Sequence, residues 1–369
     1  MAAYTTIDDP SAYFQTALHT TANAGTITND GNSDLQPDFI WSKARGGAYA
    51  HGLYDSTRGV TKLLSSNTDS DETTASAGYD LTSFNTDGFS TGNNQYSTIC
   101  GGVTYVAWQW KANGGTTASN TDGDITSTVQ VNQDAGFSIM TYTGTTGDVH
   151  TIGHGLGVTP KVWIVKARGD GGDFDDWFFW HKDMAASNII DNRMLFLNTT
   201  DALATYTGIN AVTSSTIRVK SSTTAQNGIT YVAYAFAEKQ GYSKFGKYVG
   251  NSNADGPFIY LGFKPAFVMI KRTDQGTTYS SWAMFDNKRL GYNPTGGPQS
   301  LYANRDYAEG KRGQGSDNSQ EVRIDMLSNG FKVKDGGSDE INDAADTYIY
   351  MAFAESPFVT STGIPTTAR

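Results

Sequence analysis

An alternation of large and small side chains, typical of a β-strand, occurs three times along the chain. Residues 104–112 read Thr-Tyr-Val-Ala-Trp-Gln-Trp-Lys-Ala, and related stretches return at 230–238 and 347–355. With a period of two residues, one face of each stretch carries large apolar side chains. These are Val106, Trp108 and Trp110, then Val232, Tyr234 and Phe236, then Ile349, Met351 and Phe353. Three copies predict three β modules, each with this strand at its centre and buried on both sides.

The opposite face of the repeated strand begins with a tyrosine and is otherwise mostly small. Its alanines are Ala107, Ala233, Ala235, Ala352 and Ala354. Small side chains let another layer approach closely, so we expect a second sheet, a loop, a neighbouring module or another subunit to lie against this face.

A second signature in each module consists of a proline followed by an apolar run. The runs begin at Pro37, Pro160 and Pro265, and each reaches a lysine six residues later, namely Lys43, Lys166 and Lys271. Because proline cannot donate a hydrogen bond to a sheet, it marks the start of a strand. We expect the lysine to mark the point where that strand emerges into water.

Shorter strands fill the interval between these two signatures. Aromatic strands are predicted at 52–55, 177–181 and 282–286, followed by short strands that end in Asn67, Asn198 and Asn304. Hairpins are predicted at 84–89 and 327–331, where Asp87-Gly88 and Asn329-Gly330 favour tight type I′ turns.

This order of elements predicts an all-β fold of three tandem antiparallel β-sandwich modules of jelly-roll or lectin-like type. The predicted boundaries are module 1 at 1–112, a hinge-like linker at 113–135, module 2 at 136–240, module 3 at 241–358 and a surface tail at 359–369. The additional length of module 3 lies in a glycine- and charge-rich stretch, 310–318, which we expect to be an exposed loop.

The composition supports a folded β protein and limits the classes of partner that it can bind. The chain has 41 glycines, 12% aromatic and only 17% charged residues, and a formal net charge of −10. That acidity is unfavourable for binding nucleic acid or an anionic membrane. Cys100 is the only cysteine, so no disulfide can form within the chain. The first ten residues lack a signal-peptide pattern, so folding in the cytoplasm of the producing cell is expected.

Two kinds of stretch in the chain have features of a metal site, and neither has a convincing pattern. His150 and His154 have the spacing of a helical metal site, but Gly153 and Gly155 disfavour a helix there. Oxygen-rich loops at 120–124 and 170–176 leave calcium open, although neither matches a known calcium-loop spacing. We therefore assign no metal-binding or cofactor-binding residue.

Catalytic motifs are likewise not found in the sequence. The chain has no serine-nucleophile elbow and no phosphate-binding glycine loop, while paired carboxylates on distant strands would leave no local motif. Most tryptophans fall on the repeated strand positions and are expected in the core rather than on sugar-stacking surfaces; Trp177 and Trp180 fit the core least well. No catalytic residue is assigned, and the ligand-binding residues are unknown.

Several motifs resemble a repeat domain of tailed bacteriophages, especially those of marine and cyanobacterial hosts. They are Asn29–Trp41, His51–Gly59, Asn85–Phe89, Tyr105–Lys111 and the closing Ile364–Arg369. Proteins with this domain are usually described as virion structural or tail-fibre-like. The resemblance covers essentially the whole chain but transfers no catalytic residue. The chain has no heptad repeat, and a short fibre, a spike or a head or tail decoration fits its length better than a long fibre.

Repetition, acidity and this resemblance together predict a non-enzymatic virion protein. We expect it to form a symmetric homo-oligomer or to join other virion proteins, and to present its loops to host-surface glycans. The alternatives are a phage depolymerase that acts on host polysaccharide and a free-standing lectin.

Overall fold

The computed structural model describes residues 4–169, 175–184, 193–206, 212–289, 300–311, 323–334, 336 and 340–366. Within these ranges the regular elements are β-strands, apart from the short 3-10 helices η1 (Pro10–Ala12) and η3 (Lys182–Met184). The predicted all-β class is confirmed. The stretch at 310–318 lies almost wholly outside the described residues, as do Asp170 and its neighbours up to 174.

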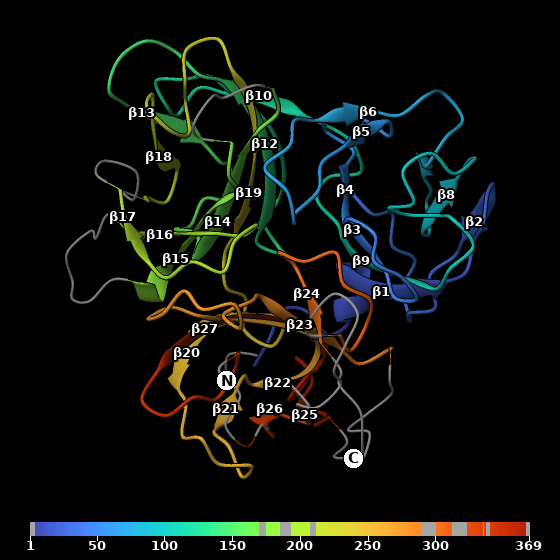
Figure 1. The fold of residues 1–369 in the computed structure, drawn as a ribbon, viewed down its shortest axis with the longest axis vertical. Helices are drawn as coiled ribbons and strands as arrows, with labels where there is room; N and C mark the ends of the chain where they lie inside the picture. The colour runs from blue at the N-terminus through green and yellow to red at the C-terminus, as the bar shows by residue number, and fades with distance from the viewer. Residues whose placement is uncertain are drawn as a thin grey trace.

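Three main sheets form the body of the protein, one for each module (Figure 1). The module 1 sheet has the order β1 (Phe14–His19), β9 (Tyr105–Trp110), β3 (Phe39–Ala44), β4 (Gly52–Asp55). The module 2 sheet has the order β10 (Ala118–Asn120), β11 (Ser127–Asn132), β12 (Phe137–Thr143), β19 (Thr230–Phe236), β14 (Val162–Ala167), β15 (Phe178–His181), β16 (Arg193–Phe196), β17 (Ala204–Thr205). The module 3 sheet has the order β20 (Ser243–Val249), β27 (Thr347–Pro357), β22 (Phe263–Arg272), β23 (Ala283–Asp286), β24 (Leu301–Tyr302).

The repeated strand lies in the middle of each sheet, as its two buried faces predict. β9, β19 and β27 each pair antiparallel with the first strand of their module on one side and with the proline-initiated strand on the other. The register is the same in the three modules: Trp108, Tyr234 and Met351 lie opposite Trp41, Ile164 and Met269 respectively.

A smaller sheet covers the outer face of each main sheet. The small sheets are β2 (Gly25–Ile27), β8 (Phe89–Thr91) and β7 (Leu81–Phe84); β13 (Val149–Gly153) and β18 (Thr216–Lys220); and β21 (Phe258–Tyr260), β26 (Gly330–Val333) and β25 (Ile324–Leu327). A separate two-stranded ribbon joins β5 (Lys62–Leu63) to β6 (Thr73–Thr74). Each module thus has its own outer apolar cluster between a large and a small sheet.

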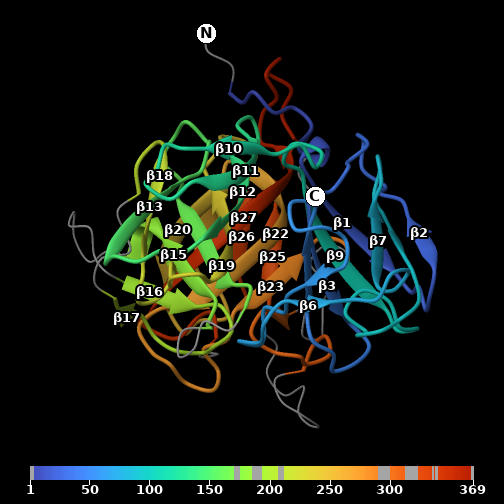
Figure 2. The ribbon, with the colours of Figure 1, turned by 90° about the horizontal axis from the view of Figure 1, so that it is seen from above.

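The inner faces of the main sheets meet in one shared core. It contains Trp108 and Trp110 of module 1, Tyr234 and Phe236 of module 2, and Phe353 of module 3. The rings contact one another across modules: Phe39 stacks on Tyr234 at 4.5 Å between centroids, and Trp110 meets Phe353 edge-on at 5.5 Å. Figure 1 shows module 1 (blue), module 2 (green) and module 3 (orange to red) arranged around a common centre, and Figure 2 shows the same modules from above.

The alanine face of the repeated strand therefore packs within a module. Ala233 and Ala235 belong to the outer cluster of module 2, and Ala352 and Ala354 to that of module 3. Of the alternatives open from the sequence, the second sheet is the one observed. Contact between modules is instead made by the large side chains of the opposite face.

The expectation that the three lysines emerge into water is wrong. Lys43, Lys166 and Lys271 are fully buried. Each ammonium donates to the carbonyl of the next residue in its own strand and to a carbonyl of a neighbouring module. The cross-module acceptors are Asp306 at 3.2 Å for Lys43, Asp69 at 2.9 Å for Lys166 and Thr200 at 3.3 Å for Lys271. The three lysines thus hydrogen-bond each module to a neighbouring one.

A second contact recurs in the same cyclic order. At the start of the aromatic strand of each module, a ring N–H of His51, Trp177 or Trp282 donates to a backbone carbonyl of the next module. The acceptors are Tyr302 at 2.8 Å, Ser65 at 2.9 Å and Phe196 at 2.9 Å. The asparagines predicted from the sequence hold these residues, because the side chains of Asn67, Asn198 and Asn304 accept the backbone N–H of the same three positions.

The ring of modules is closed by these contacts. Module 1 reaches module 3, module 2 reaches module 1, and module 3 reaches module 2. Buried ion pairs reinforce two of the three junctions. Asp55, which is paired with Arg58, accepts a hydrogen bond from the Tyr234 hydroxyl. Asp286, which is paired with Arg289, accepts one from the Trp108 indole N–H at 3.1 Å. At the third junction His181 replaces the aspartate and contacts the Tyr350 carbonyl at 3.2 Å.

The linker predicted at 113–135 is instead part of module 2. It contributes β10 and β11, and β11 pairs along β12 from Thr128 to Asn132. Its first residues are fixed to module 1, because Asp38 accepts the backbone N–H groups of Ala112, Gly114 and Gly115 at 2.7 to 2.9 Å. The glycines serve this carboxylate-binding turn, and no hinge is present in the described structure.

The predicted hairpins are present, but their turns are not of type I′. That turn requires a positive φ at both central residues, and neither Asp87 nor Asn329 has one. Gly88 has a positive φ of 87°, which favours glycine, and a side chain would clash at both glycines. A Cβ at Gly88 would lie 2.0 Å from the carbonyl oxygen of Ile27, and a Cβ at Gly330 would lie equally close to that of Ile259. Both glycines let a third strand approach.

Candidate functional site

His150, His154 and Asp124, three of the metal candidates of the sequence, make contacts within the protein. His150 lies on β13, where its Nδ1 pairs with Asp124 at 2.8 Å, and the other Asp124 oxygen accepts from Thr151. His154 is buried beyond the end of this strand and accepts the Leu156 N–H at 3.1 Å. Across the described ranges, no three His, Cys, Asp or Glu side chains come together as a set able to hold a metal ion.

The tryptophans are core residues, as most of them were expected to be. Trp177, one of the two doubtful ones, is fully buried, and Trp180 is half-buried and stacks on Trp163 at 6.4 Å between ring centroids. Six of the seven tryptophans are therefore buried, and Trp180 is the one that is partly exposed.

Strongly shifted pKa values often mark catalytic groups, but three of those found here belong to residues in the contacts between modules. Burial lowers the pKa of Lys43 and of Lys271 to about 7. Burial, with the Lys43 charge nearby, lowers the pKa of His51 to about 3. The Nδ1 atom of His51 accepts the Trp41 indole N–H at 2.9 Å. The proton of the neutral ring therefore sits on Nε2, which donates to the Tyr302 carbonyl. These groups have structural partners on every side.

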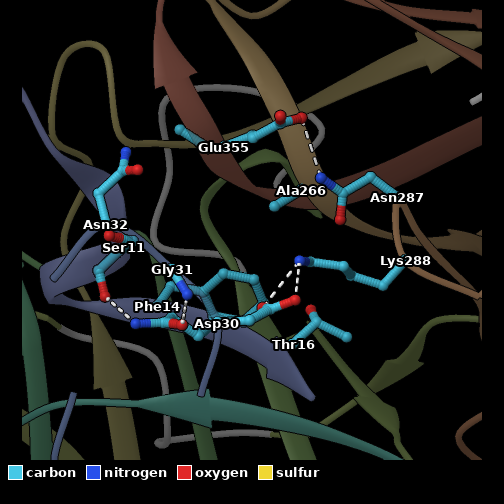
Figure 3. A pocket seen from close by; sticks show the side chains of 12 residues that line it. Ser11, Phe14, Thr16, Asp30, Gly31, Asn32, Ala266, Asn287, Lys288 and Glu355 are labelled. Atoms are coloured by element: carbon cyan, nitrogen blue, oxygen red, sulfur yellow. Dashed lines mark hydrogen bonds and ion pairs between the residues drawn. The ribbon is translucent and has the colours of Figure 1, made fainter. Parts of the chain in front are cut away.

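A pocket of about 350 Å³ opens where module 1 meets module 3 (Figure 3). Module 1 supplies one wall from β1 and from the loop at 30–32. Module 3 supplies the other wall from β22, from the residues after β23 and from the end of β27. The lining residues are Ser11, Phe14, Gln15, Thr16, Asp30, Gly31, Asn32, Ala266, Asn287, Lys288, Ala354 and Glu355.

The interior of the pocket combines an apolar surface with one buried hydroxyl. Phe14, Ala266 and Ala354 provide the apolar part. Thr16 is only 5% exposed, and its Oγ1 atom has no hydrogen-bond partner in the protein. Figure 3 shows this hydroxyl turned towards the space beneath Lys288. A buried hydroxyl without a partner is costly, by about 1–3 kcal/mol, unless something in the pocket binds to it.

Thr16 is also an exception to the repeat. It lies opposite Trp108 in the sheet register, and the same position is Ile139 opposite Tyr234 in module 2 and Phe245 opposite Met351 in module 3. Ile139 and Phe245 both belong to the shared core, whereas Thr16 does not. The pocket therefore exists where module 1 replaces a core side chain by a small polar one.

The rim of the pocket carries balanced charges that are already paired. Lys288 binds both oxygens of Asp30 at 2.8 and 2.9 Å, which ties module 3 to module 1. Glu355 accepts from Lys264 at 3.0 Å and from the Asn287 amide at 2.9 Å. The rim thus presents donors and acceptors with little net charge.

The loop at the rim is held in place by Gln15. Its side-chain amide donates to the carbonyls of Ser11 and Ser33, and its oxygen accepts the N–H of Gly31 at 2.8 Å. The loop that carries Asp30 and Asn32 is therefore positioned by a buried side chain. This preorganises the module 1 wall.

Sequence reasoning missed this pocket, although one signal was available. Aligning the first strands of the three modules places Thr16 against Ile139 and Phe245, which is the only hint of a gap in the core. The opposite wall comes from residues more than 250 positions away, such as Asn287 and Glu355. No local motif could bring these together.

The architecture defines a class: an all-β protein of three interlocked repeats closed around one core. The chain belongs to the family described as Domain of unknown function (DUF7483), whose model matches residues 9–357. That match spans all three modules, so the family unit is the whole interlocked body rather than one module. No curated protein and no solved structure matches the chain. In the described part of the chain, no helix has the length and apolar character needed to cross a membrane.

Proposed function

We propose that this chain is a non-enzymatic structural protein of a bacteriophage virion, a short fibre, spike or head or tail decoration. The observation that carries the proposal is the closed ring of modules. Fully buried lysines, indole N–H donors and ion pairs fasten each module to the next. A rigid body of this kind suits a protein whose task is to hold surfaces in fixed positions on a particle.

The ring also determines which surfaces remain for assembly. A head-to-tail contact that closes on itself leaves no open end, and here the closure takes place within one chain. Contacts with other copies or with other virion proteins must therefore use the outer small sheets, their loops and the strand edges. In this proposal, the homo-oligomer forms through those outer surfaces.

The sequence resemblance supports the same assignment. The motif at 29–41 forms the rim loop of the pocket and the start of β3, and the motif at 105–111 forms the central strand β9. Lys43, His51 and Lys271 have strongly shifted pKa values and hydrogen-bond modules to one another, which supports a structural rather than a catalytic role for these three groups. Display of several modules to host-surface glycans would give avidity.

Immunogold electron microscopy tests the virion role directly. Antibodies raised against the recombinant chain should label intact phage particles from the source culture at a defined place on the head or tail. Labelling confined to cell debris, with clean particles, would reject the proposal. Light scattering of the purified chain in calcium and then in chelator gives its native mass, and an unchanged oligomer in both would show assembly without a metal.

A further inference from the structure

We infer that the pocket between modules 1 and 3 binds a neutral polyhydroxylated molecule of about monosaccharide size. This inference rests on the proposed function in one respect, since a sugar site is useful to a virion protein that adheres to host glycans. The site itself is argued from the pocket alone.

The size of the pocket sets the first limit. At about 350 Å³ it lies at the lower end of the ~300–1,000 Å³ range of small-molecule sites. A single sugar ring fits this space, and a long oligosaccharide would extend out of it. The pocket is open on one side, so a sugar at the end of a glycan chain can enter with the rest of the chain outside.

The chemistry of the lining sets the second limit. A sugar hydroxyl both donates and accepts, and the pocket offers the matching groups close together. Carboxylate oxygens of Asp30 and Glu355 accept, the Lys288 ammonium donates, and the Thr16 hydroxyl does both. The apolar surface of Phe14, Ala266 and Ala354 suits the C–H face of a sugar ring.

Charge argues for a neutral ligand. Both carboxylates of the lining already have lysine partners, Lys288 for Asp30 and Lys264 for Glu355. A phosphate or carboxylate ligand would have to compete with these carboxylates for the same ammonium groups. A cationic ligand would have to compete with Lys288 and Lys264 for the carboxylates of Asp30 and Glu355.

The other two junctions do not offer such a site. At the junction of modules 2 and 3, the core position of Thr16 is filled by Phe245, and Met184 of η3 also belongs to the shared core there. At the junction of modules 1 and 2, Ile139 fills it, and Gln130 bonds across to Ser56 and Thr57 at 2.9 Å. One chain therefore carries one such site among the junctions described.

The repeat itself supplies the test variant. Thr16→Ile introduces the side chain that module 2 has at the same register position, so it should narrow the base of the pocket, remove the hydroxyl and preserve the fold. Thr16→Val keeps the shape and removes only the hydroxyl. Thr26→Ile is the matched control, because Thr26 lies on an exposed position of β2 in the same module.

Saturation-transfer NMR with glucose, galactose, mannose and N-acetylglucosamine, each at millimolar concentration, provides the measurement. We expect the wild-type chain and Thr26→Ile to bind at least one of the four. Thr16→Val should bind that sugar about tenfold more weakly, and Thr16→Ile should lose the signal. If no sugar binds the wild-type chain, or if Thr16→Ile binds as well as the wild type, the inference is overturned.

Folding of the variants is checked by thermal unfolding, and Ala266→Val, from the opposite wall, replaces Thr16→Ile if the latter lacks a cooperative transition. Failure here and failure of the virion role are distinguishable. A chain that labels particles but binds none of the sugars removes only the pocket site. A chain that binds sugar but is absent from particles removes only the virion role.

Discussion

Breaking the ion pair at the junction of modules 1 and 2 should destabilise the whole protein rather than one module. Asp55 and Arg58 are completely buried, and the Tyr234 hydroxyl of module 2 donates to Asp55 at 2.7 Å. Burial alone would lower the pKa of Arg58, but Asp55, Tyr234 and Glu72 outweigh it and raise that pKa above its ordinary value. Asp55→Ala would leave the guanidinium buried with Glu72 as its remaining carboxylate partner, at 3.0 Å.

The expected magnitude follows from the cost of an uncompensated buried charge. Removing one partner of a buried ion pair typically costs ~3–5 kcal/mol. Tyr234→Phe removes one hydrogen bond to a charged group, worth about 1.5–3 kcal/mol. Because both variants remove the same contact across the junction, the double variant should be more stable than the sum of the two effects predicts, by about 1 kcal/mol or more.

Guanidinium unfolding followed by tryptophan fluorescence provides the assay. The seven tryptophans are distributed over the three modules, so a module that unfolded alone would give its own transition. We expect one transition for the wild type and one, at lower denaturant, for each variant. Separate transitions, or costs of Asp55→Ala and Tyr234→Phe that add within ~0.5 kcal/mol, would refute the interlocked ring.

Three further predictions follow from buried groups and close contacts. The folded pKa of His51 is about 3, while an unfolded histidine titrates near ~6.5. The unfolded state therefore binds the proton first, and stability should decline as the pH falls from about 6.5 towards 3. His51→Gln should reduce that slope by up to ~1.4 kcal/mol per pH unit in denaturant titrations, and an unchanged slope would contradict the neutral buried ring. The folded pKa of Lys43 is about 7 and that of an unfolded lysine ~10.4, so stability should rise with pH across this window. Lys43→Met should reduce that rise and leave the part contributed by Lys271, whose pKa burial also lowers to about 7. A Lys43→Met chain with the same rise as the wild type would show that Lys43 is solvated. Gly88→Ala should cost more than ~1 kcal/mol, because its Cβ would meet the Ile27 carbonyl. Gly78→Ala serves as the control, because Gly78 has a similar positive φ, 82° against 87° at Gly88, and nothing within 4 Å of its Cβ; equal melting temperatures for the two variants would argue against the close approach.

The arrangement of strands within a module could be read from the sequence because the repeated strand has a clear period of two. Its large face, with Trp108, Tyr234 and Met351, was expected in a core, and it is the face that enters the shared core. The asparagines that end the short strands were also visible. Their role, accepting the N–H of His51, Trp177 and Trp282, required the structure.

The relation between modules could not be predicted, for a physical reason. A sequence shows that Lys43 follows an apolar run, and exposure is the normal condition of lysine. The partner that makes its burial tolerable is the Asp306 carbonyl, more than 260 residues away. The glycine-rich stretch after Ala112 resembled a linker for the same reason, since its binding to Asp38 has no signature in the stretch itself.

The pocket, too, could be predicted only in part from the sequence. The Thr16 exception was present in the repeat and could be found by alignment of the modules. The wall that faces it depends on how module 3 closes on module 1, and this is fixed by contacts such as Asp286 to the Trp108 indole. Departures from an internal repeat are therefore the positions to inspect first in a chain of this kind.

Quantitative mass spectrometry of purified phage particles from the source culture tests the central functional claim most directly. With isotope-labelled peptides from each of the three modules as standards, the account predicts that all three are present in equal amounts and at a constant ratio to the major capsid protein across density-gradient fractions. Absence of these peptides from particles, together with their recovery in the soluble lysate, would contradict a virion role and favour a free lectin or an enzyme.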